Sequence, residues 1–227
     1  MKRKTLRLAI AVCMVLVASG VMKAQEKHMG LALKGSTMGY GGDAVIQFNK
    51  RMTARLGYDN LNLNIPFDFE ESDISYSANA NVKTGALSAL YDYYLARNIF
   101  VTTGVALNNF DFNTKGTPDK AMTYGDITIP KEKIGTFEYD VRPSLRVSPY
   151  LGVGFGRTIS PDKLVAFCVE LGAFYQGSPD VSIKTDGLLS PTSNPERGQE
   201  ALYESQLSQY YLYPYLKFSL SFNLLSL

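Results

Sequence analysis

Apolar and polar residues alternate along several stretches of the chain, and this pattern predicts β-strands. In the clearest stretch, Val141 to Gly156, the odd positions are apolar and the even positions are mostly polar or small. The stretches Leu164 to Gln176 and Leu212 to Leu224 repeat the pattern. A period of two is typical of a strand with one face in an apolar environment and the other in a polar one.

Weaker alternation adds five more stretches, so that eight strands are predicted. The five are Leu31 to Thr37, Ala44 to Asn49, Met52 to Asp59, Lys83 to Tyr93 and Phe100 to Asn109. The connections between the eight strands alternate in length, short at one end and long at the other, except that the first one is also short. The long polar connections run approximately from Asn62 to Ala80, from Asp111 to Asp140 and from Gly177 to Gln209. This asymmetry predicts an all-β fold, an eight-stranded antiparallel transmembrane β-barrel with short periplasmic turns and long extracellular loops.

A soluble barrel of the lipocalin kind also alternates, so the surroundings of the apolar face need further evidence. The polar face carries ionisable side chains, which an apolar ligand cavity would exclude. Aromatic residues on the apolar face of the predicted strands lie near strand ends, as they do in the aromatic belts at the two membrane interfaces. These residues are Phe48, Tyr93, Phe155 and Phe222 toward the short turns, and Tyr58, Tyr175 and Tyr210 toward the loops. Together these features favour the membrane barrel.

The strand positions that are predicted to point into the barrel also carry charged side chains, which we expect to form ion pairs. Counting from the short turns places Glu170 between Arg146 and Lys217 on neighbouring strands. The pairs Arg55 with Asp92 and Lys34 with Asp43 are predicted by the same reasoning. An eight-stranded barrel is only wide enough for side chains, and an isolated buried charge is costly. The sequence therefore predicts a barrel that is plugged by a charge network.

The first 24 residues have a basic start, an apolar run from Leu8 to Val17 and small residues before Ala24, which indicates a secretory signal peptide. An uncleaved anchor is the alternative, although the apolar run is shorter than a spanning helix requires. Removing these residues leaves 18 of the 23 basic side chains against 21 acidic ones, which changes the net charge from +2 to −3. A mildly acidic chain lacks the basic surface that nucleic acid requires. We therefore expect a barrel domain over residues 25–227, located in the cell outer membrane, with no nucleic-acid partner.

Catalytic and metal-binding motifs are scarce, and no catalytic residue, metal or cofactor is predicted. His28 is the only histidine and is expected to be a solvated terminal residue, while Cys168 lies on the inward parity as a small buried thiol. Asp68, Glu70, Glu71 and Asp73 form an acidic cluster that is either a cation site or a solvated charge run. Ser193 and Glu196 form a capping box, which predicts one short loop helix within Asn194 to Ser208.

Four segments resemble a group of uncharacterised small outer-membrane barrel proteins of Gram-negative bacteria. They are Leu33 to Gly41, Ser148 to Gly156, Tyr175 to Val181 and Tyr213 to Phe222. The resemblance covers most of the mature chain and implies a single-chain barrel in the outer membrane, more distantly similar to OmpA-type and OmpW-type domains. It implies no reaction. Such chains commonly end in an aromatic residue, whereas this chain ends in Leu227, which bears on its recognition by the outer-membrane insertion machinery.

Three functions stay open at this point. The first is a non-enzymatic structural or surface-binding role through the long loops, with an extracellular ligand. The alternative is a narrow, porin-like conduit for small or apolar molecules, and the third is a lipid-modifying membrane enzyme. The expected partners are outer-membrane lipid, the insertion machinery and that extracellular ligand, and the expected state is a monomer. Complementary inward charges favour the plugged, surface-binding protein over the conduit.

Overall fold

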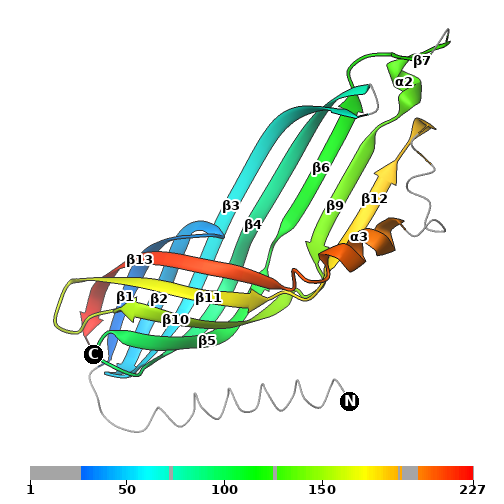
Figure 1. Cartoon of the computed structure of the whole chain (residues 1–227). Helices are drawn as coiled ribbons and strands as arrows, with labels where there is room; N and C mark the ends of the chain where they lie inside the picture. The colour runs from blue at the N-terminus through cyan, green and yellow to red at the C-terminus, as the bar shows by residue number, and fades with distance from the viewer. Residues whose placement is uncertain (1–26, 72–73, 125–126, 189, 191–198, 227) are drawn as a thin grey trace.

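Eight antiparallel strands close into a ring in the computed structural model, which confirms the predicted fold class (Figure 1). The structure describes residues 27–71, 74–124, 127–188, 190 and 199–226, so the predicted signal peptide and the Ser193/Glu196 capping box lie outside it. The ring strands, in chain order, are β1 (His28–Ser36), β2 (Gly39–Asn49), β3 (Met52–Glu71), β4 (Ile74–Tyr94), β5 (Ile99–Asn108), β10 (Val147–Gly156), β11 (Val165–Tyr175) and β13 (Leu212–Ser226). Pairing of β1 with both β2 and β13 closes the ring.

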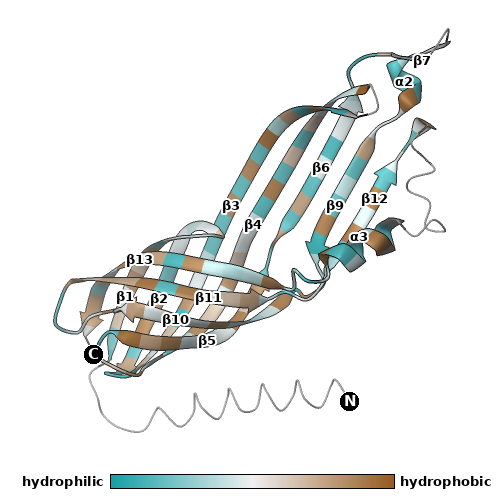
Figure 2. Cartoon of the chain, in the orientation of Figure 1, coloured by the Kyte–Doolittle hydropathy of each residue, from teal (hydrophilic) through white to brown (hydrophobic). Residues whose placement is uncertain are grey.

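The outer wall of the ring is apolar, and the alternation follows from the strand pleat. Leu151 is 65% exposed and Phe155 is 63% exposed, whereas their neighbour Gly152 faces the bore and is buried. Figure 2 shows hydrophobic residues along the strands of the ring. An exposed apolar belt of this extent marks a surface that lipid or protein covers. Within the described residues, no helix is long and apolar enough to cross a membrane.

The barrel has a short-turn end, which holds the connections at residues 50–51, 95–98 and 157–164. The ring begins at His28 of β1 and finishes at Ser226 of β13, and both residues lie at this end (Figure 1). At the opposite end the wall does not stop at the ring. Strands β3 and β4 continue together well beyond the point where β2 ends.

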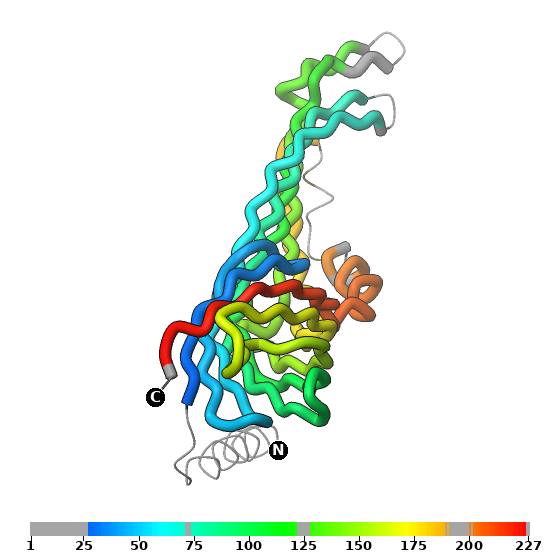
Figure 3. The backbone as a smooth tube through the Cα atoms, turned by 90° about the vertical axis from the view of Figure 1, so that its left-hand side faces the viewer, coloured from blue at the N-terminus to red at the C-terminus, as the bar shows by residue number. Residues whose placement is uncertain are grey.

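A five-stranded projecting sheet replaces the predicted long loops (Figures 1 and 3). It is formed by residues 60–71 of β3, residues 74–85 of β4, β6 (Asp111–Pro118), β9 (Phe137–Pro143) and β12 (Pro179–Thr185). The prediction of loops is therefore wrong over residues 62–71, 74–80, 111–118, 137–140 and 179–185, which form strands of this sheet. These segments are rich in asparagine, aspartate and serine, which have low intrinsic strand preference, and pairing with distant strands overrides that preference.

Three strands of the projecting sheet are continuations of ring strands after a short break. The breaks lie at residues 109–110 between β5 and β6, at 144–146 between β9 and β10, and at 176–178 between β11 and β12. Gly177 has a φ of 73°, a left-handed conformation that glycine adopts without steric cost. At Asn108 the side-chain oxygen accepts a hydrogen bond from the Phe110 amide at 2.8 Å. Such local irregularities let the sheet leave the curvature of the ring without ending.

Helix α3 (Gln199–Leu207) lies against the free edge of β12. The Ile183 amide donates a hydrogen bond to the Glu200 carboxylate at 2.8 Å, and the Val181 amide donates one to Glu204 at 3.3 Å. The helix falls within the predicted range of 194–208, and residues 194–198 lie outside the described part. Smaller elements are a hairpin of β7 (Met122–Tyr124) with β8 (Ile127–Ile129) and the four-residue helix α2 (Lys131–Ile134). Helix α3 thus covers a strand edge that would otherwise be open to pairing.

Replacing both carboxylates, in Glu200→Ala with Glu204→Ala, tests this protection of the β12 edge. We expect hydrogen exchange at the Val181 and Ile183 amides to become about tenfold faster, because a hydrogen bond to a charged group contributes roughly 1.5 kcal/mol. NMR of the protein in detergent measures both rates. The matched control is Gln206→Ala on the exposed side of the same helix. Equal rates in the two variants would show that the carboxylates do not hold this edge.

Candidate functional site

The centre of the bore is occupied by a buried charge cluster around Arg55 of β3. The Nη2 atom of Arg55 lies 2.7 Å from Asp92 Oδ1 of β4 and 2.8 Å from Glu170 Oε2 of β11. The ammonium of Lys217, on β13, lies 2.6 Å from the same Glu170 oxygen. Asp43 of β2 is within 3.7 Å of both cations. One arginine and one lysine therefore join the walls of the barrel across its interior.

A second part of the cluster lies around Lys34 of β1. Its ammonium is 2.6 Å from Asp43 Oδ1 and 2.8 Å from Asp59 Oδ2. Because Asp43 contacts Lys34, Arg55 and Lys217, the two parts form one interior charge network. Its members are three cations, Lys34, Arg55 and Lys217, and four carboxylates, Asp43, Asp59, Asp92 and Glu170. Sequence analysis did not single out Asp59, although it shares the inward parity of Arg55 on the same strand.

Hydroxyl groups of other strands donate further hydrogen bonds to three of the carboxylates. Thr102 Oγ1 donates a hydrogen bond to Asp92 at 2.8 Å, and the Tyr150 hydroxyl donates one to Glu170 at 2.8 Å. Ser36 Oγ donates to Asp59 at 3.1 Å. Buried ions contribute to stability only when opposite charges and hydrogen-bond donors surround them, because their desolvation is costly. The network meets that condition at these carboxylates.

Glycines on the inner wall make room for these long side chains. A Cβ atom on Gly57 would meet the Asp43 carboxylate and the Lys34 ammonium, which lie across the neighbouring strand. A Cβ on Gly172 would meet the Tyr150 hydroxyl, and one on Gly154 would meet the Phe100 ring. These three glycines therefore leave space for side chains that pack in the bore.

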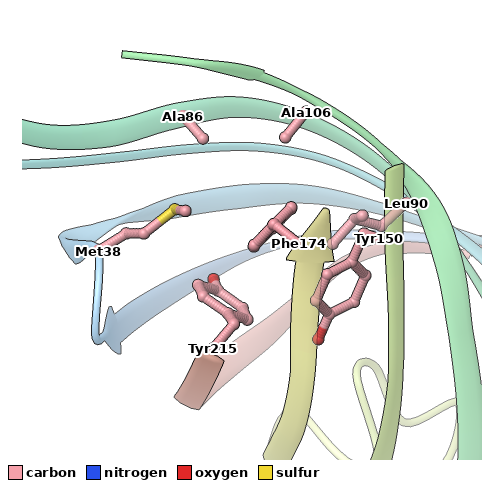
Figure 4. Packing of buried hydrophobic residues seen from close by; sticks show 7 residues of the cluster. All are labelled: Met38, Ala86, Leu90, Ala106, Tyr150, Phe174 and Tyr215. Carbon is pink, nitrogen blue, oxygen red and sulfur yellow. The ribbon is translucent and has the colours of Figure 1, made fainter. Parts of the chain in front are cut away.

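An apolar layer closes the bore on the side of the projecting sheet (Figure 4). The rings of Tyr150, Phe174 and Tyr215 contact one another, with centroid separations of 4.5, 5.6 and 5.1 Å. The remaining members of this cluster are Met38, Ala86, Leu90 and Ala106. Since the Tyr150 hydroxyl also reaches Glu170, the apolar layer rests directly on the charge network.

A third layer closes the bore at the short-turn end. The connection between β10 and β11 folds inward, and Ile159 is 1% exposed in a cluster with Ala32 and Val45. Beside it, the Thr158 amide donates a hydrogen bond to the Tyr94 hydroxyl at 2.9 Å. The bore thus holds an apolar layer toward each end and the charge network between them.

Arg146 does not belong to this network, which corrects the predicted grouping with Glu170. Arg146 is exposed in the break between β9 and β10. The register places Glu170 opposite Gly154, eight residues from Arg146, which is roughly 26 Å along the strand. Counting from the strand ends misjudged this depth, and Arg55 from the third strand supplies the charge instead. The other predicted interior residues, Lys34, Asp43, Arg55, Asp92, Glu170 and Lys217, lie together in the bore.

The single cysteine and the single histidine of the described residues are both buried and lie apart. Cys168 is 0% exposed, and its Sγ lies 3.0 Å from Ser219 Oγ. His28 is 7% exposed within β1, so the expectation of a solvated terminal histidine is wrong. The strand β13 pairs with Cys168 at Ser219 and with His28 at Ser226, a separation of roughly 23 Å along that strand. Cys168 and His28 therefore form no catalytic pair.

The predicted aromatic belts occupy the outer wall, with one exception. On the strands, Phe155 is 63%, Tyr58 54%, Tyr175 46% and Tyr93 38% exposed, and Phe48 and Phe222 are half-buried. Tyr210 is 63% exposed but precedes β13, so it is not part of a strand. The neighbouring Tyr211 contacts the Tyr175 ring at 5.9 Å.

The acidic cluster of the predicted first loop lies on strands. Asp68 and Glu70, at the end of β3, accept hydrogen bonds from Ser77 at 2.9 Å and Ser75 at 3.1 Å on β4. Asp73 lies outside the described residues, and no side-chain placement is described for Glu71. In the described part of the chain, no group of three or more His, Cys, Asp or Glu residues is arranged to hold a metal ion.

The faces of the projecting sheet reverse the hydropathy of the ring. On β3 the inward positions carry Thr53, Arg55 and Asp59 within the ring, but Leu63, Ile65 and Phe67 beyond it. On β4 the outward positions change from tyrosine, alanine and leucine within the ring to serine, asparagine and lysine beyond it. The reversal occurs at paired positions, Asn60 opposite Gly85. The sheet therefore has one polar face and one apolar face, which continues the inner wall of the barrel.

The apolar face carries a row of contacting aromatic rings and is partly open to solvent. The row runs from Phe67 and Phe69 on β3 through Tyr76 on β4 to Phe137 and Tyr139 on β9, with centroid separations of 5.2 to 6.0 Å. It ends at Tyr203 of α3. Near the β3 edge, Leu63, Ile65 and Phe67 are 43%, 48% and 40% exposed. An open apolar patch on a rigid sheet is typical of a binding surface.

The opposite face of the projecting sheet is hydrophilic and carries exposed ion pairs. The Lys115 ammonium lies 3.0 Å from Glu138, and the Asn113 amide donates a hydrogen bond to the same carboxylate at 2.9 Å. These two partners lower the pKa of Glu138 below its ordinary value. The polar face thus suits contact with water.

Two solved structures share this fold. The crystal structure of Acinetobacter baumannii CarO is 21% identical in sequence with a TM-score of 0.54, and the match covers 86% of this chain and 97% of that one. That of Acinetobacter baumannii CarO2 is 19% identical with a TM-score of 0.57, and the match covers 88% and 100%. No protein-family model and no curated protein sequence matches the chain. At this identity the likeness shows the fold alone, and similarity to OmpA-type and OmpW-type domains stays a prediction.

The charge network predicts a large effect of Glu170→Gln on stability. Arg55 and Lys217 contact the same Glu170 oxygen, so losing its charge leaves two cations facing each other in the bore. We expect the free energy of unfolding to fall by about 3 kcal/mol. Glu70→Gln, at an exposed position, is the control and should change it by less than about 0.5 kcal/mol. Urea unfolding in lipid vesicles measures both, and equal midpoints would contradict the buried network.

The glycine packing predicts that Gly57→Ala destabilises the barrel. A methyl group there would displace the Asp43–Lys34 ion pair, and overpacking of this kind costs about 1–3 kcal/mol. Gly35→Ala on β1 is the matched control, because its added Cβ meets no atom within 4 Å. The same unfolding assay applies. A Gly57→Ala variant as stable as Gly35→Ala would show that the ion pair does not fill the space in front of Gly57.

Proposed function

We propose that the protein is a closed outer-membrane β-barrel that binds an extracellular partner through its projecting sheet. The outer-membrane location is supported by the apolar outer wall, the secretory leader and the fold shared with the CarO structures. Short turns face the periplasm in barrels of this kind, which directs the projecting sheet outward. The start of β1 and the end of β13 lie at the short-turn end, in keeping with this orientation.

The filled bore is the observation that carries this proposal. An ion network spans the interior, and apolar layers lie above and below it. A conduit requires a continuous space lined by small residues or by charge of one sign, whereas this interior pairs opposite charges at direct contact distance. Opening a path would require separating Arg55 from Asp92 and Glu170. The geometry therefore favours a surface or structural role over transport.

The projecting sheet provides the binding surface in this proposal. Its rigid paired strands hold the exposed Leu63, Ile65 and Phe67 well beyond the ring. A rigid scaffold that displays apolar and aromatic groups suits recognition, since little conformational entropy is lost on binding. The partner we infer has an apolar or aromatic contact surface. We propose no catalytic role, because the lone His28 and Cys168 are buried apart from each other.

Single-channel recording tests the closed bore. The mature chain, inserted in planar bilayers, should show no steady conductance, because the interior is filled by side chains. The gel mobility of the same preparation before and after boiling verifies that the inserted protein is folded. A steady current carried by most inserted molecules would contradict the closed barrel and favour the alternative function, a conduit.

Retention on a phenyl matrix tests the apolar binding surface, with the protein held in lipid nanodiscs that cover its transmembrane wall. Ile65→Ser should elute earlier than the parent protein, because it removes an exposed apolar group from the face. Asn64→Ser, at the next position on the polar face, is the matched control and should elute with the parent. Identical elution of all three proteins would show that this face offers no accessible apolar contact.

A further inference from the structure

A cavity at the short-turn end is lined by three separate connections of the barrel. Its volume is about 600 Å³, and it lies between the β2–β3, β4–β5 and β10–β11 connections. The first supplies Lys50, the second Arg97, and the third Arg157 and Lys163. In the proposed orientation, this cavity lies at the periplasmic surface of the membrane.

The cations of this cavity have no acidic partner in the described part of the chain. Lys50, Arg97, Arg157 and Lys163 form no ion pair with any described residue, in contrast to the cations of the bore. A single carboxylate, Asp162, lines the same cavity. With four positive charges and one negative charge around it, the cavity is suited to an anion.

The cavity is held in shape by contacts between its walls. The Arg157 guanidinium lies over the Tyr94 ring at 4.7 Å from its centroid and donates a hydrogen bond to the Lys50 carbonyl at 3.2 Å. The Gly156 amide donates to the Asn98 carbonyl at 2.8 Å. These contacts tie all three connections together. Connections that are fixed in this way lose little freedom when an anion binds.

The apolar outer wall of the barrel adjoins this cationic cavity. Val165 and Phe167 of β11 line it, and they are 41% and 54% exposed on the outward parity. On the neighbouring strand β10, the outward residue Phe155 pairs with Val169, which lies two positions after Phe167 on β11. An anionic group in the cavity would thus lie directly below a surface that contacts acyl chains. This juxtaposition matches an amphiphile with an anionic head better than a free anion.

We propose that the cavity binds the phosphate of an anionic phospholipid in the inner leaflet of the outer membrane. Lys50, Arg97 and Lys163 contact the headgroup, and Arg157 holds the connections in place. The acyl chains lie along Val165 and Phe167. The inference rests on the orientation in the proposed function, because the opposite orientation would place the cavity in the outer leaflet.

Native mass spectrometry of the full mature chain, released from detergent with added lipid, tests this site. The parent protein should bind phosphatidylglycerol at least tenfold more tightly than phosphatidylcholine. The double variant Arg97→Gln/Lys163→Gln should lower the affinity for phosphatidylglycerol about 25-fold, at about fivefold for each charge near the lipid surface. Its affinity for phosphatidylcholine should stay unchanged.

The control is Arg51→Gln/Lys27→Gln, which removes two exposed charges at the same end without altering the cavity. This variant should bind phosphatidylglycerol like the parent. Equal losses in the two double variants would overturn the site in favour of general surface charge, and competition by millimolar inorganic phosphate would overturn lipid recognition in favour of a free-anion site. A barrel that conducts current but retains selective lipid binding would overturn the proposed function alone.

Discussion

The requirement that charges inside the bore be paired organises the whole barrel. Arg55 contacts carboxylates from three other strands, Asp43 of β2, Asp92 of β4 and Glu170 of β11. An ion pair in a low-dielectric interior depends strongly on separation. A shift of any of these strands by one residue would turn its charged side chain toward the outer wall. The network therefore specifies the register of strands that are distant in sequence, and the inner-wall glycines give its side chains room.

In the proposed function, a closed bore leaves the two ends of the barrel for contact with partners. With the interior occupied, the described surfaces that are open to a partner are the projecting sheet and the short-turn end. The first offers an apolar, aromatic face that includes Ile65 and Phe67, and the second offers the cations Arg97 and Lys163, which form no ion pair with the described residues. In the proposed orientation the first surface faces the cell exterior and the second a lipid headgroup layer, which agrees with their different chemistry. The barrel itself serves as the rigid frame between them.

The sequence predicted which side chains point into the bore, because this follows from their alternation along a strand. It did not predict which residues of different strands lie side by side, because this depends on the register between strands. Parity alone placed Lys34, Asp43 and Arg55 inside the bore, because side chains alternate strictly along a strand. Whether Glu170 meets Arg55 or Arg146 depends on how far along the barrel axis each residue lies on its own strand. Counting from predicted strand ends gives that position poorly when a break interrupts the strand. Asp59 was missed for a related reason. It lies at the last position before the hydropathy reverses, which is also the last residue of the predicted strand Met52 to Asp59.

The reversal itself shows why the projecting sheet was mistaken for loops. From Thr53 to Phe69, β3 keeps a period of two, but its apolar residues move from the even to the odd positions at Asn60. If the outer face meets lipid below this level and water above it, as the proposed function requires, the same pleat needs opposite patterns in the two parts. On β4 the reversal falls at Gly85, which pairs with Asn60, and the break at residues 109–110 follows on the next strand. The change of parity falls at one level on two neighbouring strands, β3 and β4. In the proposed orientation this level corresponds to the outer boundary of the membrane, and above it the inner wall becomes the apolar surface that the sheet presents.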